Sequence, residues 1–356
     1  MSLPQFKLKA AVAHAAPVYM DKEATTAKAV RIIQDAGKQG VKLLAFPETF
    51  IPGFPYFTMA YPPLDQTAVL ARYAEQSVVC SASDPSVRAI QEACRDAGVT
   101  VNLGVSERVD GGYTLFNSQV TIDHAGGILG VHRKLQPTYA ERYVWGQGDG
   151  STLRVWRVDV EGNGEDGEGN GAEGGQKGAK GGGYYNLGGL CCWENTLNGA
   201  RQALIEEDQH IHVGAWPAIS TMKGFDGGVG DAQIEALMKN HALTAQVFVL
   251  TAAPHVDDGC LGWMERNIGP QDFVKKGGGW SAIIHPFCSF LAGPETGGGD
   301  RLVVAELDSK DFGPVKVWID GNGHYKRPEV LEMRVDRKQR WTVPGQSGSQ
   351  VTKESV

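Results

Sequence analysis

Short strand-like runs alternate with longer helix-like runs along the first part of this chain, and that alternation restricts the possible folds most strongly. Residues 8–18 and 42–46 are apolar and extended in pattern, whereas 22–39, 66–79 and 85–97 repeat apolar residues at helical spacing. Strands that alternate with helices of this length are typical of layered α/β folds. We therefore expect an α/β protein whose sheet carries helices on its face.

Three consecutive runs at 100–108, 113–123 and 128–133 are strand-like with only short turns between them, so the sheet should mix antiparallel and parallel neighbours. Polar catalytic residues are then expected where strands end. The later part of the chain continues the alternation, with strands predicted at 155–160, 184–191, 211–216, 246–251, 280–285 and 302–307 and helices at 196–207 and 231–244.

Two segments lack a core pattern. Residues 161–183 contain eleven glycines and five acidic residues and no apolar residue larger than alanine, which predicts a disordered insertion that is harmless to the fold. Such an insertion is also expected to hinder long assemblies. Residues 329–356 are charged and aperiodic, and we interpret them as a C-terminal tail or an interface element following a single domain at 1–328.

The bulk composition gives no support for several classes of partner. A formal net charge of -7 gives no electrostatic reason to expect nucleic acid or an anionic membrane surface. No window approaches the roughly 20 uninterrupted apolar residues of a membrane span. The six cysteines show neither the paired spacing of a zinc site nor a dense disulfide framework, which favours a reducing, cytoplasmic setting without a metal.

Cys192 is the candidate nucleophile. It stands at the end of the apolar run 184–191 and at the start of a helix-like segment, where free N–H groups are expected to favour a thiolate. Cys191 is a rival, but neighbours on a strand face opposite ways, and proximity to Trp193 and the helix start favours Cys192.

Three charged residues stand in similar contexts upstream: Glu48 after 44–47, Lys134 after a strand, and Glu141 seven residues later. Taken singly, each has an ordinary interpretation as a strand-end acid or a surface ion pair, and a free Cys is usually a buried small hydrophobe. Taken together they supply a nucleophile, a base, a cation and a second acid, the groups that covalent hydrolysis needs. Prolines beside Glu48 and Glu141 are expected to hold the loops rigid.

Four sequence blocks in this order resemble the nitrilase branch of the carbon–nitrogen hydrolase superfamily. They are 46–56 around Glu48, 133–150 around Lys134 and Glu141, 192–195 with the sequence Cys-Trp-Glu-Asn, and 323–328 near the C-terminal end. The resemblance assigns the nucleophile to Cys192, the general base to Glu48, stabilisation of the tetrahedral species to Lys134, and support of that lysine to Glu141.

The resemblance also implies a nitrilase-type αββα sandwich that pairs on dimerisation into a four-layer αββα-αββα arrangement, and often longer spiral homo-oligomers. No metal or organic cofactor is implied. Trp193 directly after the cysteine favours nitriles over amides, with hydrolysis to a carboxylic acid and ammonia through a thioimidate and a thioester. Phe54 and Tyr56, with Trp193, are candidate substrate-binding residues, although the aromatic cluster 50–61 fits core packing or an oligomer contact equally well.

Two positions depart from the family's pattern. Asn198 stands where a proline is common, so the entrance of the following helix is expected to be looser, and Thr244 stands where relatives usually carry Glu, which is expected to weaken the support of the site. Two alternatives stay open: a nitrile or cyanide hydratase that releases the amide, and a catalytically weak homologue that serves as an assembly or binding protein. Neither the particular nitrile nor the assembly size follows from the sequence.

Overall fold

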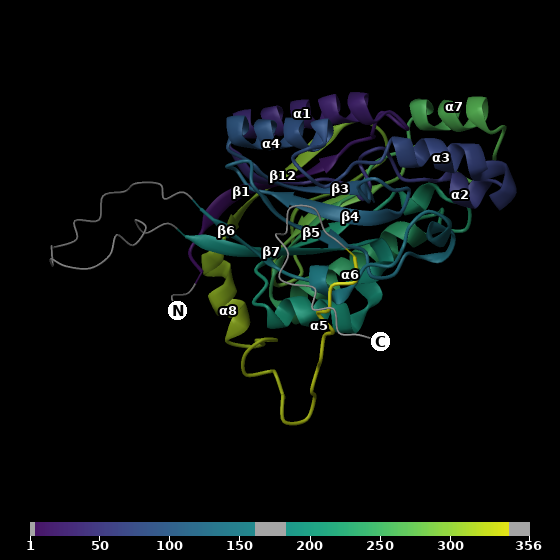
Figure 1. Cartoon of the computed structure of the whole chain (residues 1–356). Helices are drawn as coiled ribbons and strands as arrows, with labels where there is room; N and C mark the ends of the chain where they lie inside the picture. Colours follow the sequence, from purple (N-terminus) through teal and green to yellow (C-terminus); the bar gives the residue numbers. More distant parts are fainter. Residues whose placement is uncertain (1–3, 161–182, 342–356) are drawn as a thin grey trace, which may run out of the picture.

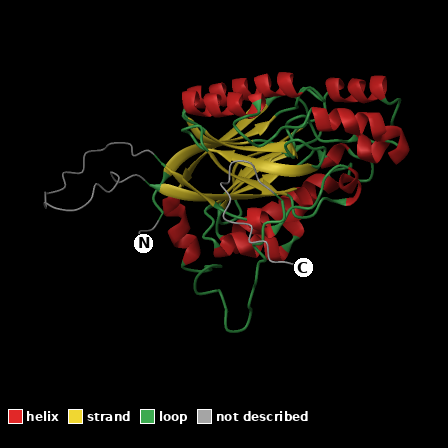
Figure 2. Ribbon diagram, in the orientation of Figure 1, coloured by secondary structure: helices red, strands yellow, loops and turns green. Residues whose placement is uncertain are grey.

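Two six-stranded sheets lie face to face between layers of helices in the computed structural model (Figures 1 and 2). The structure describes residues 4–160 and 183–341. Residues 161–182 of the predicted Gly-rich insertion therefore lie outside the described residues. The same holds for residues 342–356 of the predicted tail.

The first sheet has the strand order β12-β1-β2-β3-β4-β5. Its central strands β1, β2 and β3 run parallel, while β12, β4 and β5 are antiparallel to their neighbours. The sheet is therefore mixed, as the sequence predicts. The bounds are β1 (Lys7–His14), β2 (Val41–Ala45), β3 (Thr100–Arg108), β4 (Leu115–Ile122), β5 (Ile128–Arg133) and β12 (Arg301–Asp308).

The second sheet repeats this plan with the order β11-β10-β9-β8-β7-β6. Strands β7, β8 and β9 are parallel, and the outer strands are antiparallel. The bounds are β6 (Trp156–Asp159), β7 (Tyr184–Cys191), β8 (Ile211–Ala215), β9 (Phe248–Ala252), β10 (Trp280–Ile284) and β11 (Phe290–Thr296).

Helices cover both outer faces (Figure 1). α1 (Lys22–Lys38) and α4 (Pro85–Ala97) pack on the first sheet, and α5 (Asn198–Glu206) and α6 (Val229–Ala245) on the second. The cap of α4 is readable from the sequence, since Asp84 accepts a bond from the Ser86 N–H and Gly98 ends the helix at φ 63°. The remaining helices are α2 (Phe57–Ala60), α3 (Thr67–Glu75), α7 (Asp258–Asn267) and α8 (Phe312–Lys316).

The interior between the sheets is apolar. Alternate residues of β1 and β2 meet alternate residues of β7, β8 and β9 in one buried cluster that includes Val12, Leu43, Leu187, Val213 and Leu250. The layers therefore follow the order helix, sheet, sheet, helix. The predicted α/β class and the αββα sandwich are confirmed.

Four elements were not predicted: α7, β11 and the short helices α2 and α8. α7 buries Cys260, Trp263 and Met264 at helical spacing, but this apolar stripe is narrow and easily overlooked. β11 is an edge strand interrupted by Gly293 and Pro294, which weaken a strand signal. The helix predicted over 66–79 ends earlier, at Glu75, and Val78 instead bridges to β3.

The described part of the predicted tail, 329–341, contains no helix or strand but contacts the body. The Arg337 guanidinium forms an ion pair with Glu207, and the Trp341 ring lies edge-on to Phe116 with centroids 5.4 Å apart. Among the described residues, no helix combines the length and the apolar character that crossing a membrane requires.

Candidate active site

The four predicted catalytic residues meet at the carboxyl ends of strands from both sheets. Glu48 follows β2, Lys134 follows β5, and Cys192 follows β7, whereas Glu141 lies in the short 3₁₀ helix Tyr139–Tyr143. All four are buried. The Cys192 sulfur and one carboxylate oxygen each of Glu48 and Glu141 lie within 4.8 Å of one another.

Lys134 places its charge between the two carboxylates. Its Nζ lies 2.9 Å from Glu48 Oε1 and 2.7 Å from Glu141 Oε2. Burial alone would lower the pKa of Lys134, but the Glu141 and Glu48 carboxylates outweigh burial and raise that pKa well above its usual value. The lysine is therefore an ammonium, and it supplies the positive charge at the centre of the cluster.

Glu48 is prepared to accept a proton. Its Oε1 receives hydrogen bonds from Lys134 Nζ and, at 2.6 Å, from Asn117 Nδ2, whereas Oε2 has no partner among the described residues. Burial raises the pKa of Glu48 to about 7, against the opposing effect of the Lys134 ammonium. A buried carboxylate with a free oxygen and a pKa near neutrality has the properties of a general base.

Cys192 adopts a strained backbone with φ 53°, in the left-handed region that residues other than glycine rarely occupy. Thr49 and Tyr139, also non-glycine residues, have φ values of 44° and 49° and lie next to Glu48 and close to Glu141. Three of the chain's strained positions thus flank the site. Strain of this kind re-aims a side chain at the end of a strand, as in the nucleophile elbow of α/β-hydrolases.

The expectation that the resting Cys192 favours a thiolate is wrong. Burial, together with the Glu48 carboxylate, raises the pKa of this thiol well above its usual value, and Lys134 and the Trp193 N–H offset only part of that rise. Moreover, the segment after Cys192 is the 3₁₀ helix Cys192–Thr196, and α5 begins only at Asn198. The thiol therefore needs the adjacent base.

Cys191 takes a different position. Its thiol accepts a bond from the Glu194 N–H at the start of the 3₁₀ helix, and its own N–H donates to the Glu194 carboxylate. Cys192, not Cys191, lies with the two acids, as strand alternation predicts.

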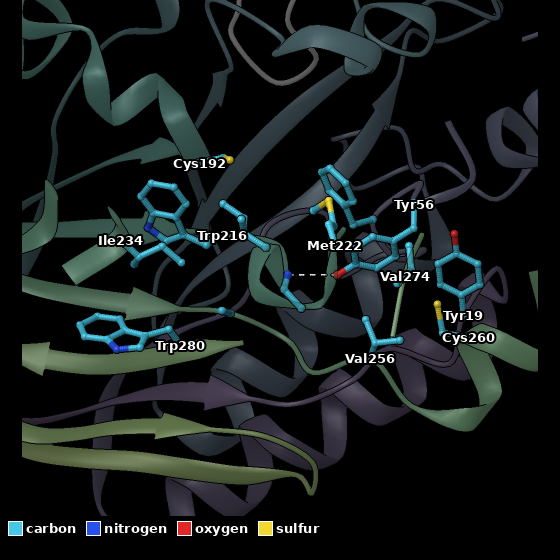
Figure 3. Close-up of a cluster of buried hydrophobic side chains, with 14 of the residues drawn as sticks. Tyr19, Tyr56, Cys192, Trp216, Met222, Ile234, Val256, Cys260, Val274 and Trp280 are labelled. Carbon is cyan, nitrogen blue, oxygen red and sulfur yellow. Dashed lines mark hydrogen bonds between the residues drawn. The ribbon is translucent and has the colours of Figure 1, made fainter. Parts of the chain in front are cut away.

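Two of the predicted substrate-binding residues share a buried cluster with the nucleophile. Phe54, Tyr56 and Cys192 belong to one buried cluster, and Figure 3 shows Cys192 at its upper edge and Tyr56 inside it, beside Tyr19. The Tyr56 hydroxyl accepts a bond from the Ala218 N–H at 3.0 Å. Trp193 is partly exposed, with its ring centroid 5.3 Å from that of Phe225. Phe50, by contrast, packs in the separate core beneath α1 and α4.

A cavity of about 580 Å³ adjoins the nucleophile turn, although Cys192 itself does not line it. The apolar part of its wall includes Tyr139, Trp193, Leu197 and Leu237, and Arg142 is among the polar residues that also line it. It is therefore an apolar space that reaches the residues directly after Cys192.

The two departures from the family pattern lie away from the carboxylates. Asn198 is exposed and accepts a bond from Arg201 within α5. Thr244 is exposed on α6, and its hydroxyl donates to the Asn240 carbonyl one turn earlier in the same helix. The expected loss of active-site support at Thr244 therefore has no counterpart in the geometry.

Sequence reasoning missed several residues that contact the site. Asn117 lies on β4 and reaches Glu48 only because β4 pairs beside β3. Asn195 Nδ2 donates to the Cys192 carbonyl at 2.8 Å, and Glu194 binds the backbone on both sides of the site. Only Glu194 and Asn195 carried a signal, because both belong to the Cys-Trp-Glu-Asn block.

Comparison with known proteins agrees with this geometry. The family model described as carbon–nitrogen hydrolase matches residues 9–317. A nitrilase of Pseudomonas syringae pv. syringae is 33% identical over 92% of this chain and 89% of its own length, and an aliphatic nitrilase of Rhodococcus rhodochrous is 33% identical over 94% and 84%.

Solved structures show the same fold. A Saccharomyces cerevisiae protein of branch 10 of the nitrilase superfamily aligns with a TM-score of 0.65 at 19% identity, covering 91% of this chain and 97% of its own. A carbon–nitrogen hydrolase of Helicobacter pylori aligns with a TM-score of 0.65 at 15% identity, covering 88% and 93%. These structures show that the chain has the αββα fold, and the family model and the relatives at 33% identity show its family. The chain belongs to the carbon–nitrogen hydrolase family.

Proposed function

We propose that this carbon–nitrogen hydrolase is a nitrilase that converts an organic nitrile to a carboxylic acid and ammonia. The observation that carries the proposal is the Cys192 thiol beside two buried carboxylates, one of them with an unpartnered oxygen, around a lysine ammonium. The nitrilases at 33% identity support a nitrile as the substrate class.

The first half of the reaction forms a thioimidate. Glu48 Oε2 takes the thiol proton as the Cys192 sulfur attacks the nitrile carbon, and the proton passes to the nitrile nitrogen as its triple bond becomes a double bond. The Lys134 ammonium stabilises the negative charge that develops on that nitrogen. Glu141 holds the ammonium in place at 2.7 Å.

The second half releases both products. Water, deprotonated by Glu48, adds to the thioimidate carbon, and Glu48 passes that proton to the nitrogen, which gives a tetrahedral species with a hydroxyl and an amino group. The hydroxyl proton then moves to the amino group as the carbon–nitrogen bond breaks, so that ammonia leaves and a thioester remains. A second water then attacks the thioester carbon, the carbon–sulfur bond breaks, and the acid leaves as the Cys192 thiol is restored. If the carbon–sulfur bond of the tetrahedral species broke first, the amide would be released instead.

The apolar cavity beside Trp193 supports a substrate with a hydrocarbon group rather than free cyanide alone. Phe54 and Tyr56 are proposed to line the path to the nucleophile. The four described groups supply nucleophile, base and cation from side chains, so the proposed mechanism requires no cofactor.

The test is the release of ammonia, acid and amide from aliphatic, arylaliphatic and aromatic nitriles and cyanide. We expect acid and ammonia from wild type and from Cys191→Ala, and neither from Cys192→Ala. Amide alone would move the assignment to a hydratase. No turnover by a folded wild type would favour the assembly or binding role.

We further propose that the enzyme is a cytoplasmic homo-oligomer built from dimers that stack two αββα units. Its six cysteines are all unpaired in the structure, which suits a reducing compartment. Several large apolar side chains between residues 317 and 331 are exposed, among them Trp318, Tyr325 and Leu331. They lie on both sides of the proposed domain boundary at 328, and exposed apolar side chains of this kind suit a contact between subunits. Sedimentation velocity at micromolar concentration tests this, and a monomer would contradict it.

A further inference from the structure

The candidate site is divided between the two sheets. Glu48 and Lys134 follow strands of the first sheet, and Glu141 lies in the loop after β5, whereas Cys192 follows β7 of the second sheet. The core between the sheets is apolar, and apolar contact is non-directional. The distance from the nucleophile to the base and cation therefore needs a directed contact between the sheets to define it.

Glu194 makes such a contact at the nucleophile turn itself, whereas Gln119 of β4 makes another within the strands, where its Nε2 donates to the Leu190 carbonyl of β7 at 3.2 Å. Glu194 Oε2 accepts a hydrogen bond from the Cys191 N–H at 2.9 Å, in the turn that carries the nucleophile. Its Oε1 accepts from the Leu135 N–H at 2.7 Å, directly after the lysine. One carboxylate thus binds the peptide next to Cys192 and the peptide next to Lys134, and its side chain has no exposed surface.

His132 completes the arrangement. Its Nε2 lies 3.1 Å from Glu194 Oε2, and its Nδ1 lies 3.1 Å from the Thr152 carbonyl oxygen. Because both partners are acceptors, both ring nitrogens must donate, so the ring is an imidazolium. Burial alone would raise the pKa of Glu194, but His132 and the two backbone N–H groups outweigh burial and hold that pKa below its usual value.

We propose that Glu194 is a positioning residue that fixes Cys192 relative to Lys134 and Glu48. The inference rests on the proposed function, because it assigns Glu194 to the same reaction. The inference adds a role that is not chemical. Glu194 touches no reacting atom, and it acts by holding two backbone N–H groups, those of Cys191 and Leu135.

The competing explanation is that Glu194 forms a buried ion pair that stabilises the fold and nothing more. The chain offers a matched control in Glu107, which is equally buried and pairs with Arg133, the neighbour of His132 on β5, at 2.5 Å. Glu107 also accepts a bond from Ser118 on β4 at 2.7 Å. All these partners belong to the first sheet, so losing Glu107 removes a buried carboxylate without releasing the nucleophile turn.

The experiment compares Glu194→Gln and Glu107→Gln in two assays, at a temperature where circular dichroism shows each folded. One assay is steady-state nitrile hydrolysis. The other is the rate at which iodoacetamide alkylates Cys192, followed by peptide mass. Alkylation requires thiol activation but no nitrile turnover, so it reports on Glu194 even if the proposed function fails.

For Glu194→Gln we expect kcat to fall about 100-fold with KM within about threefold, because a shift of about 1 Å at a reacting group costs that much. Alkylation should slow about tenfold, while Glu107→Gln stays within about threefold of wild type in both assays. Unchanged alkylation in Glu194→Gln, or an equal loss in Glu107→Gln, overturns the proposal. If Glu194→Gln does not fold, His132→Gln decides: slower alkylation supports the proposal, and a wild-type rate overturns it.

Discussion

Gly104 on β3 gives a sharp test of how Glu48 is placed. A Cβ at this position would lie 2.1 Å from the Pro47 carbonyl oxygen, 2.7 Å from the Thr49 nitrogen and 2.9 Å from the Glu48 Cα. Real contacts of a Cβ start near 3.0 Å, so the loop that carries Glu48 must retreat by about 1 Å in Gly104→Ala.

Two consequences follow from that displacement. Overpacking should destabilise the protein by about 1–3 kcal/mol. Turnover should fall about 100-fold, because the base no longer meets the thiol at the required distance. The measurements are urea unfolding and kcat on the best nitrile of the panel, with Cys192 alkylation as a second readout of thiol activation.

Gly199→Ala is the matched control. Gly199 lies in α5, seven residues after the nucleophile, and a Cβ there meets nothing within 4 Å. This substitution should leave kcat unchanged and stabilise the helix by about 0.5–1 kcal/mol. A Gly104→Ala enzyme with wild-type kcat would refute the idea that close approach of β3 positions Glu48.

Three further predictions concern the charged cluster and the neighbouring Cys191. Glu48 accepts the thiol proton only as a carboxylate, and its pKa is raised to about 7. We therefore expect kcat/KM to fall as pH falls through about 7, and a profile that stays flat down to about pH 5 would argue against Glu48 as the base. Lys134→Met leaves two buried carboxylates without their cation, so urea unfolding at pH 7 should show a loss of about 3–5 kcal/mol, whereas an unchanged midpoint would contradict the ion-pair account. Cys191→Ala should keep kcat within about threefold of wild type, and loss of turnover would return the nucleophile assignment to Cys191.

The layers of the fold could be predicted from the sequence because apolar residues in most strands and helices showed the spacing typical of that element. The runs that became β1, α1, β2 and α4 did so clearly. β11 did not, because an edge strand with Gly293 and Pro294 has little apolar alternation to show.

The residues of the candidate site also fall into those that the sequence predicted and those that it did not. Glu48, Lys134 and Cys192 could be singled out because each follows a strand, and Glu141 because it belongs to the same sequence block as Lys134. Asn117 could not, because its role depends on which strands become neighbours. The raised thiol pKa of Cys192 was also missed, since it reflects burial by residues distant in the sequence and outweighs the local N–H groups.

The most direct test of the account is peptide mass spectrometry of the enzyme quenched in acid during turnover of a slow nitrile. The account predicts an acyl adduct with the mass of the substrate's acid less water, carried by the peptide that contains Cys191 and Cys192 and assigned by fragmentation to Cys192. Product formation with the adduct on Cys191, or with no adduct on either cysteine in a quench that traps a known thioester, would contradict it.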